Sequence, residues 1–149
     1  MIKLLLADDH TLFREGLKQI FAEYKDIKVK DEAGNGKEAL QKICNHDYDV
    51  ILLDISLPDL NGLEILRQIK DSKPESKVLI LSMYPEEQFV LEAYQTGAAG
   101  YVTKSESAID LLAAIRKVAS GGKYVSERAA EKMVTHLSHS DVEPRYKKL

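Results

Sequence analysis

Continuous apolar runs that stop on polar residues recur along this chain. Residues 50–53 are all apolar, and the run stops at Asp54. A run without alternation is typical of a strand in a parallel sheet that helices cover on both faces. Residues 2–7 are apolar apart from one lysine, and this run stops at Asp8 and Asp9. The pattern predicts two buried strands with carboxylates at their carboxyl ends.

Three further segments fit strands. Residues 27–33 alternate between apolar and polar side chains, which indicates a half-exposed edge strand. Residues 77–82 and 100–104 are short, mainly apolar runs that end on Ser82 and Lys104. Five strands are therefore expected, and four of them lead into a charged or hydroxyl side chain.

Apolar positions at helical spacing lie between these strands. The predicted helices cover residues 10–24, 62–70, 86–94 and 107–119, and a further one follows Gly36 with Ala39, Leu40, Ile43 and Cys44 facing inward. Asp59 or Asn61 is expected to cap the helix at 62–70. Five strands that alternate with five helices predict a doubly wound parallel α/β sheet, because crossovers are right-handed. Another amphipathic helix is expected at 126–137, followed by a polar tail.

Composition narrows the class of protein. The chain has 149 residues, of which 44% are hydrophobic and 30% charged, as in one globular domain with an extension. No apolar run approaches the roughly 20 residues of a transmembrane helix, and no secretory signal is expected. The net charge of −3 provides no global basic field for nucleic acid, and a single cysteine excludes an internal disulfide. A cytoplasmic location is expected.

The carboxylates are candidate ligands. In open α/β sheets, ligands bind at the carboxyl ends of the strands, where Asp8, Asp9 and Asp54 are expected to meet if their two strands are neighbours. Such a cluster repels itself, so it either holds a proton with a raised pKa or binds a hard cation. Mg²⁺ fits best, because it accepts a few carboxylates and keeps positions for water and phosphate.

These strand ends, taken together, resemble the receiver domain of two-component response regulators. An acidic pair follows the first strand, an Asp the third, a Ser the fourth and a Lys the fifth, with the loop Leu-Pro-Asp-Leu-Asn-Gly at 57–62. The resemblance covers residues 1–120. It implies a flavodoxin-like (βα)5 domain whose five-stranded parallel sheet has the order 2-1-3-4-5.

The resemblance also implies a phosphoacceptor and its cation. Asp54 would accept a phosphoryl group, and Mg²⁺ would be held by Asp8, Asp9, Asp54 and the backbone carbonyl of Ser56. An aspartyl phosphate is a known type of covalent intermediate. A histidine kinase is the implied donor and partner, and the chain would be a phosphoacceptor switch rather than an enzyme.

Three further roles follow from the same resemblance. Ser82 would hydrogen-bond the phosphoryl group, Lys104 would pair with it, and Tyr101 would be the aromatic side chain that reports the switch. Phosphoryl transfer independently requires a nucleophile, a divalent cation and a fixed positive charge, which Asp54, Mg²⁺ and Lys104 would supply.

Local motifs look like the NarL/FixJ (LuxR-type) subgroup. They are Ala-Asp-Asp-His at 7–10, Gly-Ala-Ala-Gly-Tyr at 97–101, and Gly-Gly-Lys-Tyr at 121–124 before an amphipathic helix. In that subgroup a linker helix leads to a helix-turn-helix DNA-binding domain. Residues 121–149 are therefore expected to be the linker helix and tail, with the DNA-binding domain missing from a truncated chain. A phosphorylation-dependent homodimer is expected, with DNA contact only through the missing domain.

Other interpretations compete with this one. Asp8 and Asp9, taken alone, are more readily explained as caps of the first helix, and only their combination with Asp54 and Lys104 favours a site. Residues 34–39 fit the dinucleotide-binding pattern G-x-G-x-x-G/A, but they follow the polar edge strand rather than a central apolar one. A haloacid-dehalogenase-like phosphatase also uses a strand-end Asp with Mg²⁺, but it needs a second Asp two residues later, where this chain has Ser56.

Overall fold

A parallel sheet forms the centre of the protein. The computed structural model describes residues 1–83, 87–127, 129–132 and 134–135. Within these ranges the sheet has six strands in the order β2-β1-β3-β4-β5-β6. The strands are β1 (Ile2–Ala7), β2 (Ile27–Ala33), β3 (Val50–Asp54), β4 (Val78–Ser82), β5 (Gly100–Thr103) and β6 (Tyr124–Val125). The helices are α1 (Thr11–Phe21), α2 (Gly36–Asn45), α3 (Gly62–Ser72), α4 (Glu87–Thr96) and α5 (Ala108–Ala119).

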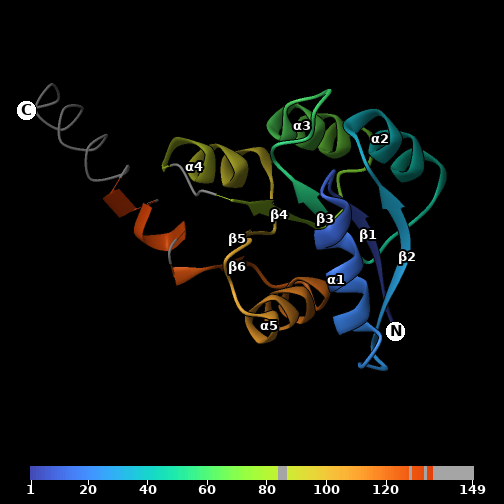
Figure 1. Cartoon of the computed structure of the whole chain (residues 1–149). Helices are drawn as coiled ribbons and strands as arrows, with labels where there is room; N and C mark the ends of the chain where they lie inside the picture. Colours follow the sequence, from blue (N-terminus) through green and yellow to red (C-terminus); the bar gives the residue numbers. More distant parts are fainter. Residues whose placement is uncertain (84–86, 128, 133, 136–149) are drawn as a thin grey trace, which may run out of the picture.

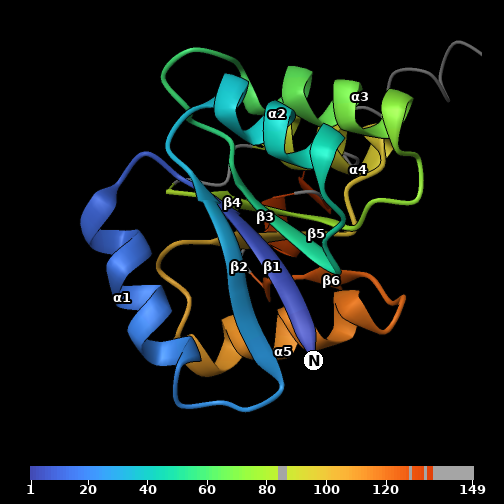
Figure 2. The same ribbon diagram turned by 90° about the vertical axis from the view of Figure 1, so that its right-hand side faces the viewer.

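Helices cover both faces of the sheet (Figures 1 and 2). Helices α2, α3 and α4 lie on one face, and α1 and α5 lie on the other. Successive residues of β3 belong to two separate cores, with Leu53 packed on the α2–α4 side and Leu52 on the α1–α5 side. Every residue of β3 and β4 is buried. This double burial explains their uninterrupted apolar sequences and confirms the doubly wound, flavodoxin-like fold.

The edge strand and the caps agree with the sequence pattern. Strand β2 pairs only with β1 among the described strands and alternates in exposure, as expected of an edge. The side chain of Asn61 accepts a hydrogen bond from the Leu63 N–H and so caps α3. The prediction for Cys44 was wrong. Its side chain is exposed, whereas Gly36, Ala39 and Ile43 are the buried residues of α2 and Leu40 packs against the core partly buried.

The sheet has one strand more than the five predicted. Strand β6 lies parallel to β5, with Tyr124 opposite Gly100 and Val125 opposite Tyr101. A strand of two residues is too short to produce a recognisable period in the sequence. The described residues after Ser126 are helical, and the Ser126 hydroxyl accepts the Ala129 N–H at the start of this helix.

The remaining sequence predictions for the C-terminal segment lie partly outside the described residues. The predicted helix at 126–137 is helical at 127, 129–132 and 134–135. Residues 128, 133 and 136–149 are not described. No helix in the described part of the chain has the length and apolar character needed to cross a membrane.

Candidate functional site

Two central strands carry a pair of buried carboxylates to one edge of the sheet. Strands β1 and β3 are adjacent and parallel, with Ala7 opposite Leu53. The residues that follow are Asp8 and Asp54, whose exposed fractions are 0% and 1%. The sequence predicted this meeting on the condition that the two strands are neighbours, because parallel strands present their carboxyl ends at the same edge.

Lys104 brings a buried cation to the same point. Its Nζ atom lies 2.6 Å from Asp8 Oδ2 and 3.0 Å from Asp54 Oδ2, and its side chain is 5% exposed. The Lys104 N–H also donates to the Ser82 carbonyl across the β4–β5 pair. The ring of Phe13 lies 4.7 Å from Nζ and shields it from solvent on one side. The ammonium therefore bridges two carboxylates in a site that excludes most water.

His10 is a member of the cluster that sequence reasoning missed. Its Nδ1 lies 3.0 Å from Asp8 Oδ1, 3.6 Å from Asp9 Oδ1 and 2.8 Å from Lys104 Nζ. Its backbone N–H also donates to Asp8 Oδ1. The sequence feature that could have indicated its role is its position directly after the acidic pair, where the first helix begins.

The cap interpretation of the acidic pair does not hold in this geometry. His10, not an aspartate, occupies the N-cap position of α1, and the Asp8 carboxylate bonds the N–H of His10 itself. Asp8 and Asp9 are therefore directed to the cluster at the sheet edge.

The electrostatics favour binding of a cation. Burial raises the pKa of Asp54 above its ordinary value, and the neighbouring charge of Asp8 raises it further. The Ser56 N–H, which donates to Asp54 Oδ1 at 2.9 Å, and the Lys104 ammonium act in the opposite direction. Lys104 pairs with two of the three carboxylates, Asp8 and Asp54, so the cluster keeps excess negative charge.

The donor set suits a divalent ion. One ligand atom from each of Asp8, Asp9, His10 and Asp54 falls within 4.8 Å of the others. Carboxylate oxygens are the ligands that Mg²⁺ prefers, and Asp9 is about one-third exposed, so the cluster opens to water on one side. The residues therefore fit a hard cation that keeps part of its hydration.

The loop after Asp54 is fastened to α2. The Asp59 carboxylate accepts the Gly36 N–H at 2.6 Å and the Lys37 N–H at 3.0 Å, and these bonds hold its pKa below the usual range. The Asn35 side chain accepts the Glu38 N–H. A dinucleotide fingerprint needs the N–H groups at this helix terminus for a pyrophosphate. They are used by the chain itself, which excludes that interpretation.

A close backbone approach explains the glycine at the start of α3. The Gly62 N–H donates to the Ile55 carbonyl, and a Cβ at this position would lie 2.5 Å from Ile55 Cα. Glycine is therefore required for the loop to fold back beside Asp54.

The remaining predicted residues lie on or directly after strands β3, β4 and β5. Ser82 ends β4 at the same edge and is 3% exposed. Ser56 is the second residue after Asp54 and contacts it through its N–H. Tyr101 is fully buried in β5, in the core on the α2–α4 side. The structure thus brings together Asp8, Asp9, Asp54 and Lys104, adds His10, and leaves Tyr101 in the core.

Comparison with known proteins assigns the class. Residues 4–116 match the response regulator receiver domain, and the chain belongs to that family. The haloacid-dehalogenase-like alternative is thereby set aside.

The relatives narrow the group. The chain is 37% identical over 144 residues to the response regulator UvrY of Escherichia coli, covering 97% of this chain and 64% of UvrY. It is 36% identical over 133 residues to the transcriptional regulatory protein DegU of Brevibacillus brevis, covering 89% of this chain and 56% of DegU. The chain thus spans about 60% of the length of these relatives.

Solved structures agree with the sequence relatives. A LuxR-family response regulator from Aurantimonas superposes with a TM-score of 0.86 at 29% identity, covering 91% of this chain and 97% of that one. The receiver domain of the putative response regulator NarL from Mycobacterium tuberculosis gives 0.76 at 32% identity, covering 80% and 97%. The LuxR/NarL subgroup expected from the sequence motifs is confirmed.

Proposed function

We propose that this chain is a phosphorylation-controlled switch in which Asp54 accepts one phosphoryl group. The donor is the phosphohistidine of a sensor histidine kinase, or a small molecule such as acetyl phosphate. The observation that supports this most strongly is the buried Asp54 carboxylate at the end of β3, with Lys104 Nζ 3.0 Å from its Oδ2 and Asp8 beside it. Phosphoryl transfer needs little more than such a positioned nucleophile and fixed compensating charge.

The chain's own residues account for the transfer. A carboxylate oxygen of Asp54 attacks phosphorus, and the phosphorus–nitrogen bond of the phosphohistidine breaks, with its electron pair remaining on the imidazole. Lys104 then exchanges its contact with Asp54 Oδ2 for one with a phosphoryl oxygen. The Ser82 hydroxyl, at the adjacent strand end, donates to another phosphoryl oxygen.

Mg²⁺ fits the acidic cluster. Asp8, Asp9, Asp54 and the backbone carbonyl of Ser56 would hold the ion, which would supply positive charge to offset the carboxylates and the phosphoryl oxygens. The support is the set of carboxylate ligand atoms within 4.8 Å of one another and the solvent-facing side at Asp9.

Stoichiometric phosphorylation tests the assignment. With acetyl phosphate and Mg²⁺, the parent chain should gain one phosphoryl group by intact mass, and EDTA should prevent the gain. Asp54→Asn should gain none, while the matched control Asp59→Asn, altered in the loop that follows, should behave as the parent does. Hydroxylamine-sensitive phosphate on Asp54→Asn would overturn the assignment. Repeated turnover of a generic phosphomonoester would instead indicate a phosphatase.

The output is proposed from the relatives. A histidine kinase in the cytoplasm would phosphorylate the chain, a phosphorylated homodimer would form, and a DNA-binding domain outside this chain would regulate transcription. A phosphoryl group adds roughly two negative charges and three acceptor oxygens, which would draw the Ser82 hydroxyl inward and let Tyr101 reorient. Ser82→Ala should accept phosphate yet show a weaker change in association by light scattering. An unchanged shift would refute this route.

A further inference from the structure

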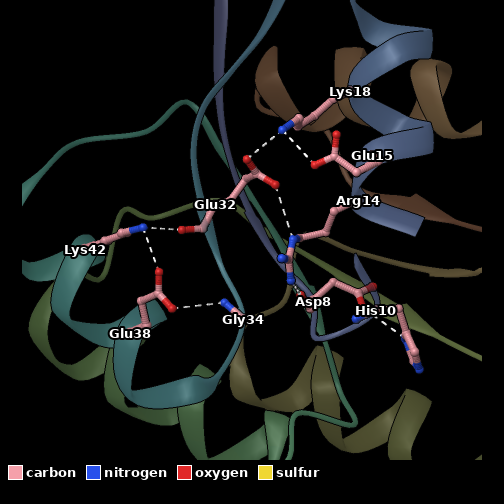
Figure 3. A network of polar contacts seen from close by, with 9 residues as sticks. All are labelled: Asp8, His10, Arg14, Glu15, Lys18, Glu32, Gly34, Glu38 and Lys42. Atoms are coloured by element: carbon pink, nitrogen blue, oxygen red, sulfur yellow. Dashed lines mark hydrogen bonds and ion pairs between the residues drawn. The ribbon is translucent and has the colours of Figure 1, made fainter. Parts of the chain in front are cut away.

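The guanidinium of Arg14 joins the acidic loop to β2. Arg14 lies on α1 and is 18% exposed. Its Nη1 donates to the backbone carbonyl of Asp8, and its Nε donates to Glu32 Oε1 at 3.2 Å. Figure 3 shows Arg14 between these two acceptors. A planar guanidinium can hold two acceptors at a fixed separation, which a lysine ammonium on a flexible stem cannot do in the same way.

The contact with Arg14 completes the restraint of the Asp8 backbone. The Asp8 N–H donates to the Ala33 carbonyl of β2 at 2.9 Å. The Asp8 carbonyl receives Arg14, and the Asp8 carboxylate receives the His10 N–H at 2.8 Å. The turn from β1 into α1 is therefore held on both sides of Asp8, just before Asp9.

Charged contacts fix the acceptor that orients Arg14. The second carboxylate oxygen of Glu32 pairs with Lys18 at 3.0 Å, and the Glu32 backbone carbonyl receives Lys42. Lys42 in turn pairs with Glu38 at 2.9 Å, and Glu38 accepts the Gly34 N–H. Figure 3 shows this network running from α1 across β2 to α2. Arg14 is thus braced from the side opposite the acidic cluster.

We propose that Arg14 is a positioning residue for the divalent cation, acting through the backbone carbonyl of Asp8. It keeps the Asp8–Asp9 turn in the geometry that directs both carboxylates to the site. The proposal rests on the proposed function, because it assumes that Mg²⁺ binds there. Replacement of a residue that orients a metal ligand typically weakens metal binding by roughly 10- to 100-fold.

The direction in which the Kd for Mg²⁺ changes distinguishes a positioning role of Arg14 from an effect of its charge alone. Arg14 is itself a cation near an acidic site, so removal of its charge alone would strengthen Mg²⁺ binding, because the Coulomb repulsion between the two cations would be lost. Positioning has the opposite consequence, because a loosened turn must be ordered again when the ion binds. Arg14→Met should therefore weaken binding, and Arg14→Lys, which keeps the charge but not the two-point contact, should restore only part of the affinity.

The experiment measures the Kd for Mg²⁺ by titration calorimetry on the full, unphosphorylated chain, well below the thermal transition. Arg14→Met should raise the Kd about tenfold. Arg116→Met is the matched control, since it removes an ion pair between Arg116, on α5, and Asp26, and its Kd should equal that of the parent. In metal-free protein, amide exchange at the His10 N–H should quicken in Arg14→Met and not in the control. An unchanged or lower Kd in Arg14→Met would refute the proposal.

Two further variants keep the outcomes distinct. Asp9→Asn tests the cation site directly. If the parent does not bind Mg²⁺, or binds it no better than Asp9→Asn does, the proposed function and the positioning role both fail. If Asp9→Asn weakens binding and Arg14→Met does not, only the positioning role fails. Should Arg14→Met not fold, Arg14→Lys decides, because it keeps the positive charge but loses the two-point contact, and it should still raise the Kd above that of the parent.

Discussion

Replacement of Lys104 by methionine tests whether the buried ammonium holds the acidic cluster together. Methionine retains the apolar stem of the side chain but removes the charge that lies 2.6 Å from Asp8 Oδ2 and 3.0 Å from Asp54 Oδ2. The two carboxylates, 0% and 1% exposed, would then face each other without a cation. Removal of one partner from a buried ion pair costs about 3–5 kcal/mol of unfolding free energy.

Protonation of Asp54 limits that cost. Its pKa already lies above the ordinary value of 3.8, and loss of the Lys104 contacts raises it further. Each unit of pKa difference between folded and unfolded chains is worth about 1.4 kcal/mol. Because the folded-state pKa is the higher one, the folded state loses stability as pH rises above the unfolded value. The destabilisation of Lys104→Met should therefore be small near pH 4 and should grow toward pH 8, to about 2–4 kcal/mol at neutral pH.

Urea unfolding of metal-free protein, followed by circular dichroism across this pH range, measures the effect. Lys73→Met is the matched control, since Lys73 pairs with the fully exposed Asp47 and should cost less than about 1 kcal/mol at every pH. The double variant Asp54→Asn/Lys104→Met should recover most of the lost stability. A loss in Lys104→Met that equals the control and does not change with pH would refute a desolvated ion pair.

Three other predictions follow from the contacts around the site. Gly62→Ala should lower the unfolding free energy by about 1–3 kcal/mol, because the added Cβ would lie 2.5 Å from Ile55 Cα; chemical denaturation measures this, and a neutral result would contradict the close approach. Asp59→Ala should lower the urea midpoint above pH 3.8, and the difference should shrink as pH falls through the depressed pKa of Asp59; a difference that persists in acid would exclude the ionised cap. Tyr94→Phe removes the hydroxyl that donates to the Tyr124 carbonyl, so amide exchange in β6 should quicken while exchange in β3 stays unchanged; equal rates in both proteins would show that this bond does not hold β6.

Much of the site was predictable because parallel strands impose simple geometry. Residues 50–53 are buried on both faces, so their apolar run marked a central strand and placed Asp54 at its end. The same reasoning placed Asp8, Ser82 and Lys104 at one edge, and the structure brings Lys104 to both carboxylates. These positions depend on strand direction and length, which the sequence pattern records directly.

The remaining contacts of the site depend on side-chain directions, which the periodicity of apolar residues in the sequence does not predict. His10 joins the cluster through its Nδ1, which lies 3.0 Å from Asp8 Oδ1, and Arg14 meets Glu32 only once β2 lies beside β1. Helix phase was also too coarse for Cys44, which lies at the margin of the apolar stripe of α2 and is exposed. These contacts arise from tertiary packing, so only the structure reveals them.

The short strand β6 is held to the rest of the protein by a few hydrogen bonds to β5 and α4. Its backbone is fastened by the Tyr124 N–H to the Ala99 carbonyl at 2.9 Å and by the Ser126 N–H to the Tyr101 carbonyl at 3.3 Å. The hydroxyl of Tyr94, from α4, donates a further hydrogen bond to the Tyr124 carbonyl. Few bonds fasten this margin, whereas β3 is paired along its length with two strands, so local opening is expected to begin here and to leave the centre intact. The helix that follows β6 is thereby connected to α4 and β5, which lie far from it in the sequence, as well as to α5, which packs against β6.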